Sequence, residues 1–404
     1  MRQVVATGLL LVAVAVTGCR ADSDRTQSRP EGNSMASYVR LFADYQQRSV
    51  QSITTNAAGN ESWFLPLADA GFGNPPTVLL ATPDGLVAQS VDRLAGVSYD
   101  GDLRWQQPHG AGLDAVYSDG ATYYRTTEGD LYAINAEGKI TLSDFFVPTS
   151  HDRGFIYLAL PRPDRHILLH TFARSEEPMP GDPPQPDSYA LLLMGDERYD
   201  DWDWMHEFEG ECLPGLMTTD LGRVVILDGN GGATSFDATT GEQTGRFTVT
   251  DREFLRASLD NDNNIIAAMR TTDNTGLLAS YTLEGKRNWE LLLDTIPAGA
   301  FTQPPAIGPD NSVLFIVGNE LLRVVNGEVQ HRSPVLSAKR QYITVLEDSS
   351  ALLVAANALI HLDPEGEQKF AVTLDPAETV TAPAVVDGKG RVCIATSRGI
   401  RSYE

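Results

Sequence analysis

The sequence predicts an all-β fold built from a four-stranded unit that repeats along most of the chain. One recurring feature is a turn that ends in glycine after an acidic or amide residue, as in Asn135–Gly138, which follows the apolar run Leu131–Ile134. A glycine there can take the positive φ that a tight hairpin needs. A second feature is a short turn with an aspartate between two apolar strands, as in Asp387–Gly388. Features that recur every roughly 40 to 55 residues are typical of a β-propeller or a similar array.

The aspartate turn occurs eight times, which predicts eight blades. We expect it to join the two inner strands of each blade, and the glycine turn to join the two outer strands, so that each blade is a four-stranded antiparallel meander. The aspartate turns are Asp84-Gly85, Asp119-Gly120, Pro163-Asp164, Asp220-Leu221-Gly222, Asp262-Asn263, Asp310-Asn311, Asp348-Ser349 and Asp387-Gly388. The glycine turns end at Gly101, Gly138, Gly195, Gly241, Gly285, Gly327 and Gly366.

The predicted strands contain near-continuous apolar runs, such as Val224–Leu227 and Leu352–Ala355. Runs of this kind indicate strands that are covered on both faces. Sheets stacked face to face around an axis provide such cover, so the pattern fits a propeller.

All five tryptophans fall shortly after a glycine, in the strand that is predicted to be outermost. Trp105 follows Gly101 by four residues, and Trp289 follows Gly285 by four residues. Twist separates the blades toward the rim, and a large ring can fill the gap there. We therefore expect most of these rings to pack in the core rather than to stack on a ligand. The five are Trp63, Trp105, Trp202, Trp204 and Trp289.

The two ends of the repeat region complete one another. The last predicted blade reaches Glu404 directly after the strand Gly399–Tyr403, without a glycine turn or a fourth strand. Near the start, Gly59–Leu67 reads as a strand without a blade, and Trp63 follows Gly59 by four residues. We predict that this N-terminal strand pairs with Gly399–Tyr403 and closes the last blade, which removes exposed sheet edges.

The composition limits the possible partners. The formal charge of −23 over 404 residues argues against a nucleic-acid partner, because no basic face is available to displace phosphate counterions. The three cysteines include no CxxC pair, which excludes a zinc cage of the usual spacing. Cys212 and Cys393 read as small buried apolar residues, or as a disulfide if the fold brings their α-carbons together.

Residues 1–18 read as a lipoprotein signal peptide. Arg2 precedes an apolar run that is too short for a comfortable transmembrane helix. Val16–Cys19 resembles a lipobox, and by that resemblance Cys19 would become the first mature residue and carry lipid on its sulfur and its amine. The alternative is an ordinary cleaved signal with an incidental cysteine. By the same resemblance, Arg20 after the cysteine, where an Asp would retain the protein, implies sorting to the outer membrane.

The next two segments differ in composition from the repeat. Residues 19–33 cannot bury enough apolar area to fold, so we expect a disordered tether. Residues 34–58 are expected to be helical, because Ser34 can cap a helix from Met35 to about Val50 whose apolar side chains recur at three- and four-residue steps. This helix packs on the domain's own surface or is offered to a partner. Residues 59–404 form the predicted propeller.

Two stretches interrupt the repeat. Ser175–Ser188 contains five prolines and four acidic residues, so it can be neither strand nor helix. It is a tolerated insertion or a loop that contacts a partner. Asp196–Trp204 mixes acidic with aromatic residues. It is a solvated blade edge or a site for a cationic or sugar partner.

The sequence predicts no catalytic, cofactor-binding or metal-binding residues. Asp260, Asp262 and Asn264 alternate as in a calcium loop, but the positions that would need Gly and Glu hold Ile265 and Thr271. The segment also occupies a hairpin-turn position, where Asp and Asn serve the turn. The Gly-x-Ser-x-Gly elbow of serine hydrolases does not occur in the sequence.

Two stretches, Gly129–Lys139 and Tyr281–Trp289, resemble the repeat of the quinoprotein (PQQ-like) β-propellers, and the resemblance extends loosely over Gly59–Glu404. That family contains quinone-dependent dehydrogenases and non-enzymatic lipoproteins, among them the BamB scaffolds of the outer-membrane β-barrel assembly machinery. The resemblance therefore implies the fold, but it does not by itself choose an activity.

The dehydrogenases of this family usually carry adjacent cysteines over the quinone, a tryptophan beneath it, a calcium ion and an Asp base. This sequence has no adjacent cysteines. We therefore expect a non-enzymatic lipoprotein without a cofactor, anchored in the outer membrane through Cys19 and facing the periplasm, whose propeller binds an envelope protein. The alternatives are a PQQ-binding quinoprotein and a carbohydrate-binding propeller.

Overall fold

The chain divides into two units in this computed structural model, Met1–Ser34 and Met35–Glu404. All the described residues belong to the second unit, and the fold given below is the fold of that unit. The predicted signal peptide, tether and lipidation site at Cys19 lie outside the described residues. The structure describes residues 50–51, 54–55, 57–108, 111–118, 121–126, 131–144, 154–162, 165–173, 188–195, 202–209, 216–219, 221–228, 230–295, 303–335 and 341–404.

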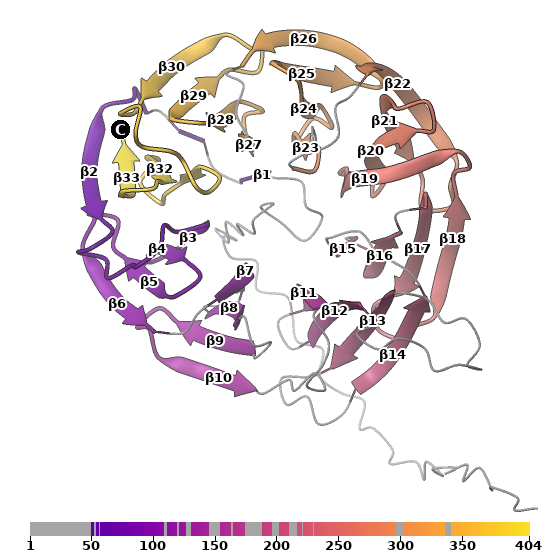
Figure 1. Cartoon of the computed structure of the whole chain (residues 1–404), viewed down its shortest axis with the longest axis horizontal. Coiled ribbons are helices and arrows are strands. Elements are labelled where there is room, and N and C mark those ends of the chain that lie inside the picture. The colour runs from indigo at the N-terminus through magenta and orange to yellow at the C-terminus, as the bar shows by residue number, and fades with distance from the viewer. Residues whose placement is uncertain are drawn as a thin grey trace, which may run out of the picture. The chain divides into compact units, whose positions relative to one another are not determined.

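The described residues form eight β-sheets and no helix. Figure 1 shows the sheets around a common centre, each with its first strand near the centre and its last strand at the periphery. Each sheet contains four strands that pair antiparallel, and one sheet adds a fifth strand, so the all-β prediction and the four-stranded antiparallel unit are confirmed. In this part of the chain, no helix is long and apolar enough to cross a membrane.

We number the sheets 1 to 8 in chain order, with the innermost strand of each sheet first. Sheets 1 to 4 consist of β3 (Val78–Thr82), β4 (Gly85–Gln89), β5 (Leu94–Val97) and β6 (Leu103–Gln107); β7 (Ala111–Ser118), β8 (Ala121–Thr126), β9 (Leu131–Asn135) and β10 (Ile140–Asp144); β11 (Gly154–Arg162), β12 (Arg165–Ala173), β13 (Ser188–Gly195) and β14 (Trp202–Glu209); and β15 (Met217–Thr218), β16 (Arg223–Leu227), β17 (Gly232–Asp237) and β18 (Gln243–Thr248).

Sheets 5 to 8 follow the same order, except that the outermost strand of sheet 8 comes from the N-terminal side of the repeat region. They consist of β19 (Arg252–Leu259), β20 (Ile265–Thr271), β21 (Thr275–Tyr281) and β22 (Arg287–Thr295); β23 (Ala306–Ile307), β24 (Val313–Val317), β25 (Glu320–Val325) and β26 (Glu328–Pro334); β27 (Gln341–Leu346), β28 (Ala351–Ala355), β29 (Ala358–Leu362) and β30 (Gln368–Thr373); and β31 (Val385–Val386), β32 (Val392–Ala395), β33 (Gly399–Tyr403) and β2 (Glu61–Pro66).

The hairpin between the two outer strands has the same irregularity in sheets 1, 2, 4, 5, 6 and 7. Its glycine has a positive φ, for example 89° at Gly101, 77° at Gly138 and 85° at Gly285. The register then shifts by one residue just beyond the turn, which is a β-bulge. A bulge of this kind re-aims the side chain that follows it. The residues re-aimed in this way include Trp105, Trp204 and Trp289.

The inner strands are buried on both faces, as the apolar runs predicted. All five residues of β28 and all five of β3 are buried. The outermost strands alternate instead, because one face of the sheet meets solvent at the periphery; β30 and β18 expose most of their residues. The core therefore consists of apolar layers between neighbouring sheets, such as the cluster that joins Val225 and Phe254.

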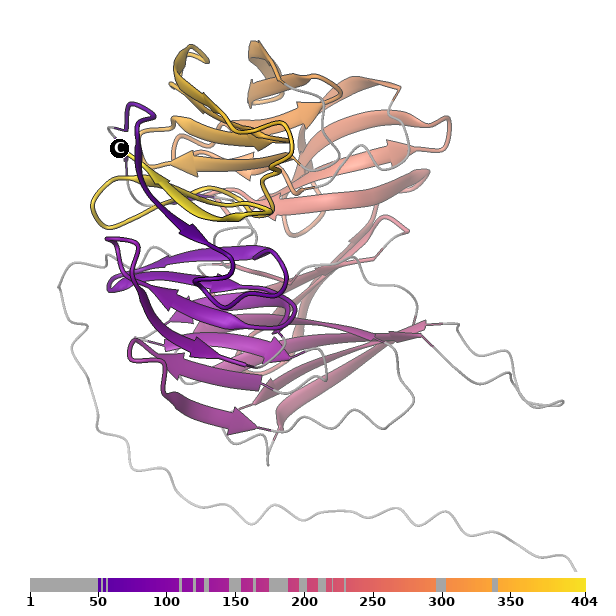
Figure 2. The same cartoon turned by 60° about the vertical axis from the view of Figure 1, so that its left-hand side comes forward.

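Strand β2 lies alongside β33, where the sequence had placed the N-terminal strand. The two strands pair antiparallel, with Glu61 opposite Tyr403 and Pro66 opposite Gly399. Figures 1 and 2 show the indigo β2 on the outer side of the yellow β33. A bulge separates Glu61 from Trp63, at the same place as in the other sheets, although no turn connects these two strands.

Sheet 7 departs from the four-stranded expectation, because it has a fifth strand. Strand β1 (Val50–Gln51) pairs parallel with the inner edge of β27 (Figure 1). A pattern of apolar side chains cannot reveal a strand of two residues, since the pairing is made by the backbone. The helix predicted from Met35 to about Val50 lies outside the described residues, except for Val50, which belongs to β1.

Candidate functional site

Neighbouring sheets meet through an aromatic ring of one outermost strand and the turn glycine of the next sheet. A Cβ added at Gly101 would lie 2.8 Å from the Cδ2 atom of Trp63. A Cβ at Gly138 would lie 2.3 Å from Cγ of Trp105, and the corresponding distance from Gly241 to Trp204 is 2.5 Å. Only glycine therefore lets the ring approach the turn without displacing it.

The indole N–H groups fasten the same contacts by hydrogen bonds to turn carbonyls. Nε1 of Trp63 donates to the Tyr99 carbonyl at 3.0 Å, and Nε1 of Trp105 donates to the Ala136 carbonyl at 3.0 Å. Trp204 makes the same bond with Ala238 at 3.2 Å. Each ring is thus held by its apolar face and by its polar edge, which is how a partly buried tryptophan is satisfied.

The contact recurs around the described junctions. A Cβ at Gly285 would lie 2.5 Å from Phe247, one at Gly327 would lie 3.0 Å from Trp289, and one at Gly59 would lie 3.1 Å from Phe370. Between sheets 6 and 7 the contact is weaker, because His331 is exposed and its Cβ lies 3.7 Å from the corresponding position at Gly366. The side chains that join sheets 2 and 3 are outside the described set.

Small residues leave room for the largest rings on their own sheet. Trp105 lies opposite Gly96, Trp289 opposite Ser280 and Trp63 opposite Ser402. The prediction that the tryptophans pack between blades is confirmed for Trp63, Trp105, Trp204 and Trp289, all of which are partly buried. The spacing did not reveal which atoms receive each ring. The sequence did contain a signal for this contact, because the glycine that precedes an outermost strand is also the residue on which the aromatic ring of the preceding sheet packs.

A second set of contacts joins the sheets near the centre. Thr344 Oγ1 donates to the Ala384 carbonyl at 2.8 Å, and Ser258 Oγ donates to the Pro305 carbonyl at 2.6 Å. Thr381 donates in the same way to the carbonyl of Pro76. All three hydroxyl groups are buried, and their bonds satisfy carbonyls that would otherwise be costly to bury.

A buried ion pair links Arg401 in β33 to Glu378, which lies in the segment between β30 and β31. Glu378, which is 1% exposed, accepts hydrogen bonds from Nε and Nη2 of Arg401 at 2.9 and 3.0 Å. Arg401 also pairs with Glu61 of β2, and its guanidinium lies 4.0 Å from the centre of the Phe64 ring. Burial opposes ionisation of Glu378, but the hydrogen bonds from Arg401 and Thr396 outweigh it and hold the pKa of this carboxyl below its usual value.

Sheet 8 is tied to sheet 1 by a second buried pair. Asp387 is fully buried and accepts from Nε and Nη2 of Arg391 at 2.9 and 2.7 Å. The same Arg391 donates to the carbonyl of Tyr99, which also receives Trp63. Burial raises the pKa of the Tyr99 phenol to about 12, so this side chain stays neutral.

The aspartate turns use their carboxylates internally. Asp260 Oδ1 accepts the backbone N–H groups of Asp262 at 2.9 Å and of Asn264 at 2.8 Å, and its Oδ2 accepts Nδ2 of Asn264. Asn263 takes a φ of 62° between them. These contacts are those of a hairpin turn, and no cluster of three metal-ligating side chains occurs among the residues that the structure describes.

Two buried groups of the kind used in nucleophilic or acid–base chemistry, Cys393 and His361, are held in inactive states. Cys393 is a free and fully buried thiol, and burial raises its pKa to about 12. Burial lowers the pKa of His361 to about 4, while its Nε2 lies 3.1 Å from Ser350 Oγ. Near neutral pH the thiol is protonated and is not a nucleophilic thiolate, and the lowered pKa of the imidazole makes it a weak base.

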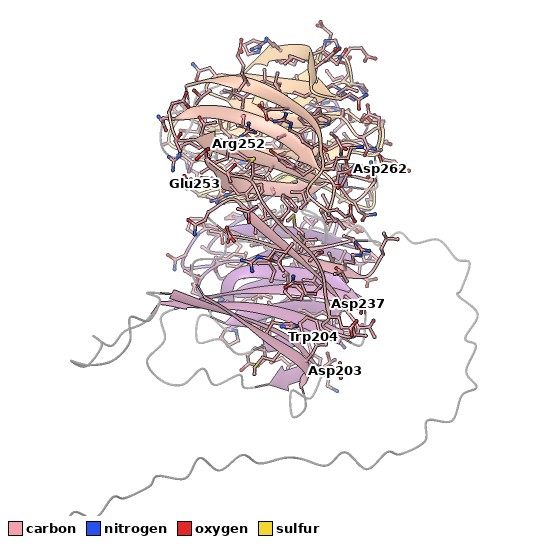
Figure 3. The ribbon with its side chains drawn as sticks, turned by 90° about the vertical axis from the view of Figure 1, so that its right-hand side faces the viewer. Asp203, Trp204, Asp237, Arg252, Glu253 and Asp262 are labelled. Atoms are coloured by element: carbon pink, nitrogen blue, oxygen red, sulfur yellow. The ribbon has the colours of Figure 1, made fainter. Side chains whose placement is uncertain are left out.

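Several residues singled out in the sequence lie outside the described residues. These are Cys19, Cys212 and most of the stretches Ser175–Ser188 and Asp196–Trp204. Of the last stretch, Asp203 is exposed and Trp204 packs against the glycine turn of sheet 4. Figure 3 shows Trp204 beside Asp237 of that turn. The Trp204 ring is therefore engaged in packing, as expected of a blade edge.

The tryptophans and the cysteine whose side chains the structure describes do not form the ring contacts expected of a quinone site. Trp63, Trp105, Trp204 and Trp289 are in outermost strands and are engaged with turns, so none of these four can form the floor of a central quinone site. Cys393 has no neighbouring cysteine in the sequence. The inner edge of β27 is already covered by β1.

Comparison with known proteins places the fold. No family model and no curated sequence matches the chain. Among solved structures, BamB from Moraxella catarrhalis is similar with a TM-score of 0.56, 15% identity, 85% of this chain covered and 96% of that chain covered. The quinohemoprotein alcohol dehydrogenase ADHIIG from Pseudomonas putida HK5 has a TM-score of 0.60 and 10% identity, over 89% of this chain and 75% of that chain. The C-terminal WD40 domain of Sif2 has a TM-score of 0.60 and 12% identity, over 85% and 97%.

These similarities define a class rather than a particular activity. The chain has a β-propeller fold, and this propeller resembles both BamB and the quinoprotein dehydrogenases. At such low sequence identity the likeness concerns the fold alone, because one fold carries many functions.

Proposed function

We propose that this protein is a non-enzymatic lipoprotein of the cell envelope, anchored in the outer membrane through lipid on Cys19 and facing the periplasm. Its β-propeller would be a rigid scaffold that binds another envelope protein. The lipobox-like Val16–Cys19 and the similarity of the propeller to BamB support this proposal.

The scaffold is proposed to be a closed ring of eight blades, one for each sheet, in which β2 completes the last blade. The aromatic-on-glycine contacts support this arrangement, because they continue from sheet 8 to sheet 1 through Trp63 and from sheet 7 to sheet 8 through Phe370. The backbones of Asn60 and Glu404 exchange two hydrogen bonds, of 3.0 and 2.8 Å, where a covalent turn joins the outer strands elsewhere.

The observation that carries the scaffold function is how the aromatic and ionised side chains are used. Trp63, Trp105 and Trp204 are bound to turns, and Asp387 and Glu378 are paired with arginines. These groups stabilise the fold, and they are not arranged to bind and transform a substrate. A rigid ring leaves exposed loops and turns to contact a partner.

Co-purification tests the proposal. The full chain would be extracted from membranes in mild detergent, and Cys19→Ala would be the matched control that keeps the propeller unchanged. We expect the wild-type protein in the outer-membrane fraction together with a reproducible envelope protein, and the variant in the soluble periplasmic fraction. Equal distribution of both proteins would contradict the anchor, and repeated recovery of the wild type alone would contradict the scaffold.

The second candidate is a quinone-binding propeller, which is favoured by the similarity to the alcohol dehydrogenase over 89% of this chain. Added PQQ, with and without calcium, would then bind the purified protein, and its absorbance would shift with saturation. A carbohydrate-binding propeller would instead give selective signals on a glycan array.

A further inference from the structure

The innermost strand of sheet 7 has an edge that is covered in an unusual way. Strand β27 pairs with β28 on its outer side and with β1 on its inner side. The register places Val50 opposite Val345 and Gln51 opposite Leu346. Among the innermost strands that the structure describes, β27 is the one that carries a further strand.

The rest of this edge is capped by a side chain that imitates a strand. Gln303, which shortly precedes the innermost strand of the neighbouring sheet 6, donates from Nε2 to the Ile343 carbonyl at 3.0 Å and accepts the Ile343 N–H at Oε1 at 2.8 Å. Both bonds are buried. A primary amide offers the same donor and acceptor pair as a backbone amide, so Gln303 occupies the position of one residue of a paired strand.

Alternate residues of a strand direct their N–H and C=O groups to the same edge. The backbone N–H and C=O groups of Ile343 and Val345 therefore point to the same side of β27. Together they form a short sheet edge that can pair with a further strand. The chain satisfies it in two pieces, with Gln303 at Ile343 and β1 at Val345. The edge has the length and polarity to hold a longer strand than the one that now covers it.

We propose that the inner edge of β27 is an acceptor for an extended peptide, and that β1 is an exchangeable internal occupant of it. The partner in the proposed scaffold function would supply an extended segment that adds as a parallel strand in place of Val50–Gln51. This inference rests on the proposed function for the identity of the ligand as a protein, and on the geometry of β27 for the site.

The ring is built so that β1 can leave without opening it. Beyond β1, Thr55 is buried and donates from Oγ1 to the Gly390 carbonyl at 2.5 Å. Gly59 then receives Phe370, and Asn60 is bonded to Glu404. The segment is thus held independently of β1, and β2 keeps its place when the two-residue strand detaches.

Because β1 pairs with β27 through two residues, a longer strand can compete with β1 for the same edge. Peptides that add to a sheet edge gain affinity from main-chain hydrogen bonds and specificity from pockets for alternate side chains. A partner strand that reaches both Val345 and Ile343, with Gln303 turned aside, would form more of these bonds than β1 does.

Peptide binding to the full chain tests the proposal. The probe is a fluorescent synthetic peptide with the sequence of residues 46–56, measured by anisotropy. Gln51→Pro removes a backbone N–H from β1 and disfavours its pairing, while Gln51→Ala keeps that N–H and is the matched control. We expect Gln51→Pro to bind the peptide at least tenfold more tightly than the wild type does, and Gln51→Ala to resemble the wild type.

A peptide with proline at the position of Gln51 should not bind any of the three proteins. Equal affinity for all proteins, or no binding to Gln51→Pro when its tryptophan fluorescence shows that it is folded, would overturn the proposal. Failure of this test leaves co-purification with an envelope protein unaffected, so the two proposals fail separately.

Hydrogen exchange in the unaltered protein gives a second measurement that needs no variant. If β1 detaches while Gln303 stays bound, the Val345 amide exchanges at least tenfold faster than the Ile343 amide. Equally slow exchange at both positions would show that β1 is a permanent part of the sheet, and it would overturn the proposal even if Gln51→Pro did not fold.

Discussion

Phe370 lies against Gly59 as Trp289 lies against Gly327, with added-Cβ distances of 3.1 and 3.0 Å. Gly327 belongs to a hairpin turn, whereas Gly59 precedes a strand that no turn connects to its neighbour. Its φ of 88° nevertheless falls in the range of the turn glycines. The junction of sheets 7 and 8 therefore reproduces, with separate segments of the chain, a contact that the other sheets make with one hairpin.

The aromatic-on-glycine contact predicts a difference between two glycines with almost the same backbone. Gly138 has a φ of 77° and faces Trp105, whereas Gly222 has a φ of 73° and has nothing within 4 Å of an added Cβ. Alanine at either site incurs the left-handed penalty of about 1 to 2 kcal/mol. Gly138→Ala should lower the free energy of unfolding by about 1 to 3 kcal/mol more, because the ring must move. Urea unfolding measures both, and equal losses would contradict the contact.

The hydrogen bonds near the centre predict a second pair of substitutions. Thr381→Val keeps the shape of a buried side chain but removes the donor to the Pro76 carbonyl. We expect it to lower the free energy of unfolding by about 1 to 3 kcal/mol, because a buried carbonyl loses its partner. Thr379 is exposed, so Thr379→Val is the control and should change stability little. Similar effects of the two substitutions in thermal unfolding would argue against the bond.

The buried Glu378–Arg401 pair predicts a pH dependence with a definite sign. The pKa of Glu378 in the folded protein lies below its usual value of 4.5, so its stabilising effect is complete above pH 4.5 and is lost as the pH falls through the folded-state pKa. Glu378→Gln should destabilise the protein near pH 7 by less than the about 3 to 5 kcal/mol of a buried charge left unpaired, because Arg401 loses its buried partner but keeps Glu61. The difference between wild type and variant should shrink toward acidic pH.

Asp375 provides the control for this pair, because its partner Arg398 is 3.3 Å away at the surface. Asp375→Asn should change stability much less than Glu378→Gln does at every pH. A wild-type-minus-variant difference for Glu378→Gln that stays constant from pH 7 to pH 3 in chemical unfolding would contradict the assigned role of the carboxylate.

Burial of Cys393 predicts an unreactive thiol. Its pKa is raised to about 12, so at pH 8 almost no thiolate is present and the sulfur is not accessible. A maleimide should modify Cys393 in the folded protein at least a hundredfold more slowly than in urea, as followed by mass spectrometry of the Cys393 peptide. Rapid labelling of the folded protein would show that sheet 8 opens, and a peptide linked to Cys212 would show the alternative disulfide.

Much of the fold was predictable because it depends on patterns among residues that are close in the sequence. The glycine at Gly138 and the apolar runs around it specify a hairpin whose strands are covered on both faces. The partner of the orphan strand that carries Trp63 could also be assigned, since the strand Gly399–Tyr403 lacked its outer neighbour. These inferences need only turn chemistry and the alternation of burial along a strand.

The remaining features depend on contacts between segments that are distant in the sequence. Gln303 could not be distinguished from a surface glutamine, because its role is defined by the backbone of Ile343 in another sheet. Strand β1 carries no pattern of its own, and the pairing of Arg401 with Glu378 and Glu61 could not be derived from spacing. Long-range polar contacts of this kind are specified by the assembled fold and leave little local trace.

At every described junction, one sheet contributes the ring and the next sheet in the numbering contributes the glycine, with sheet 1 following sheet 8. A sheet that was lost or gained by recombination would keep both halves of this match only if the exchanged piece contained one glycine and the aromatic residue that follows it. Gene duplication could therefore lengthen or shorten such a chain in whole blades, while an exchange that cut between the glycine and its aromatic neighbour would leave two mismatched surfaces.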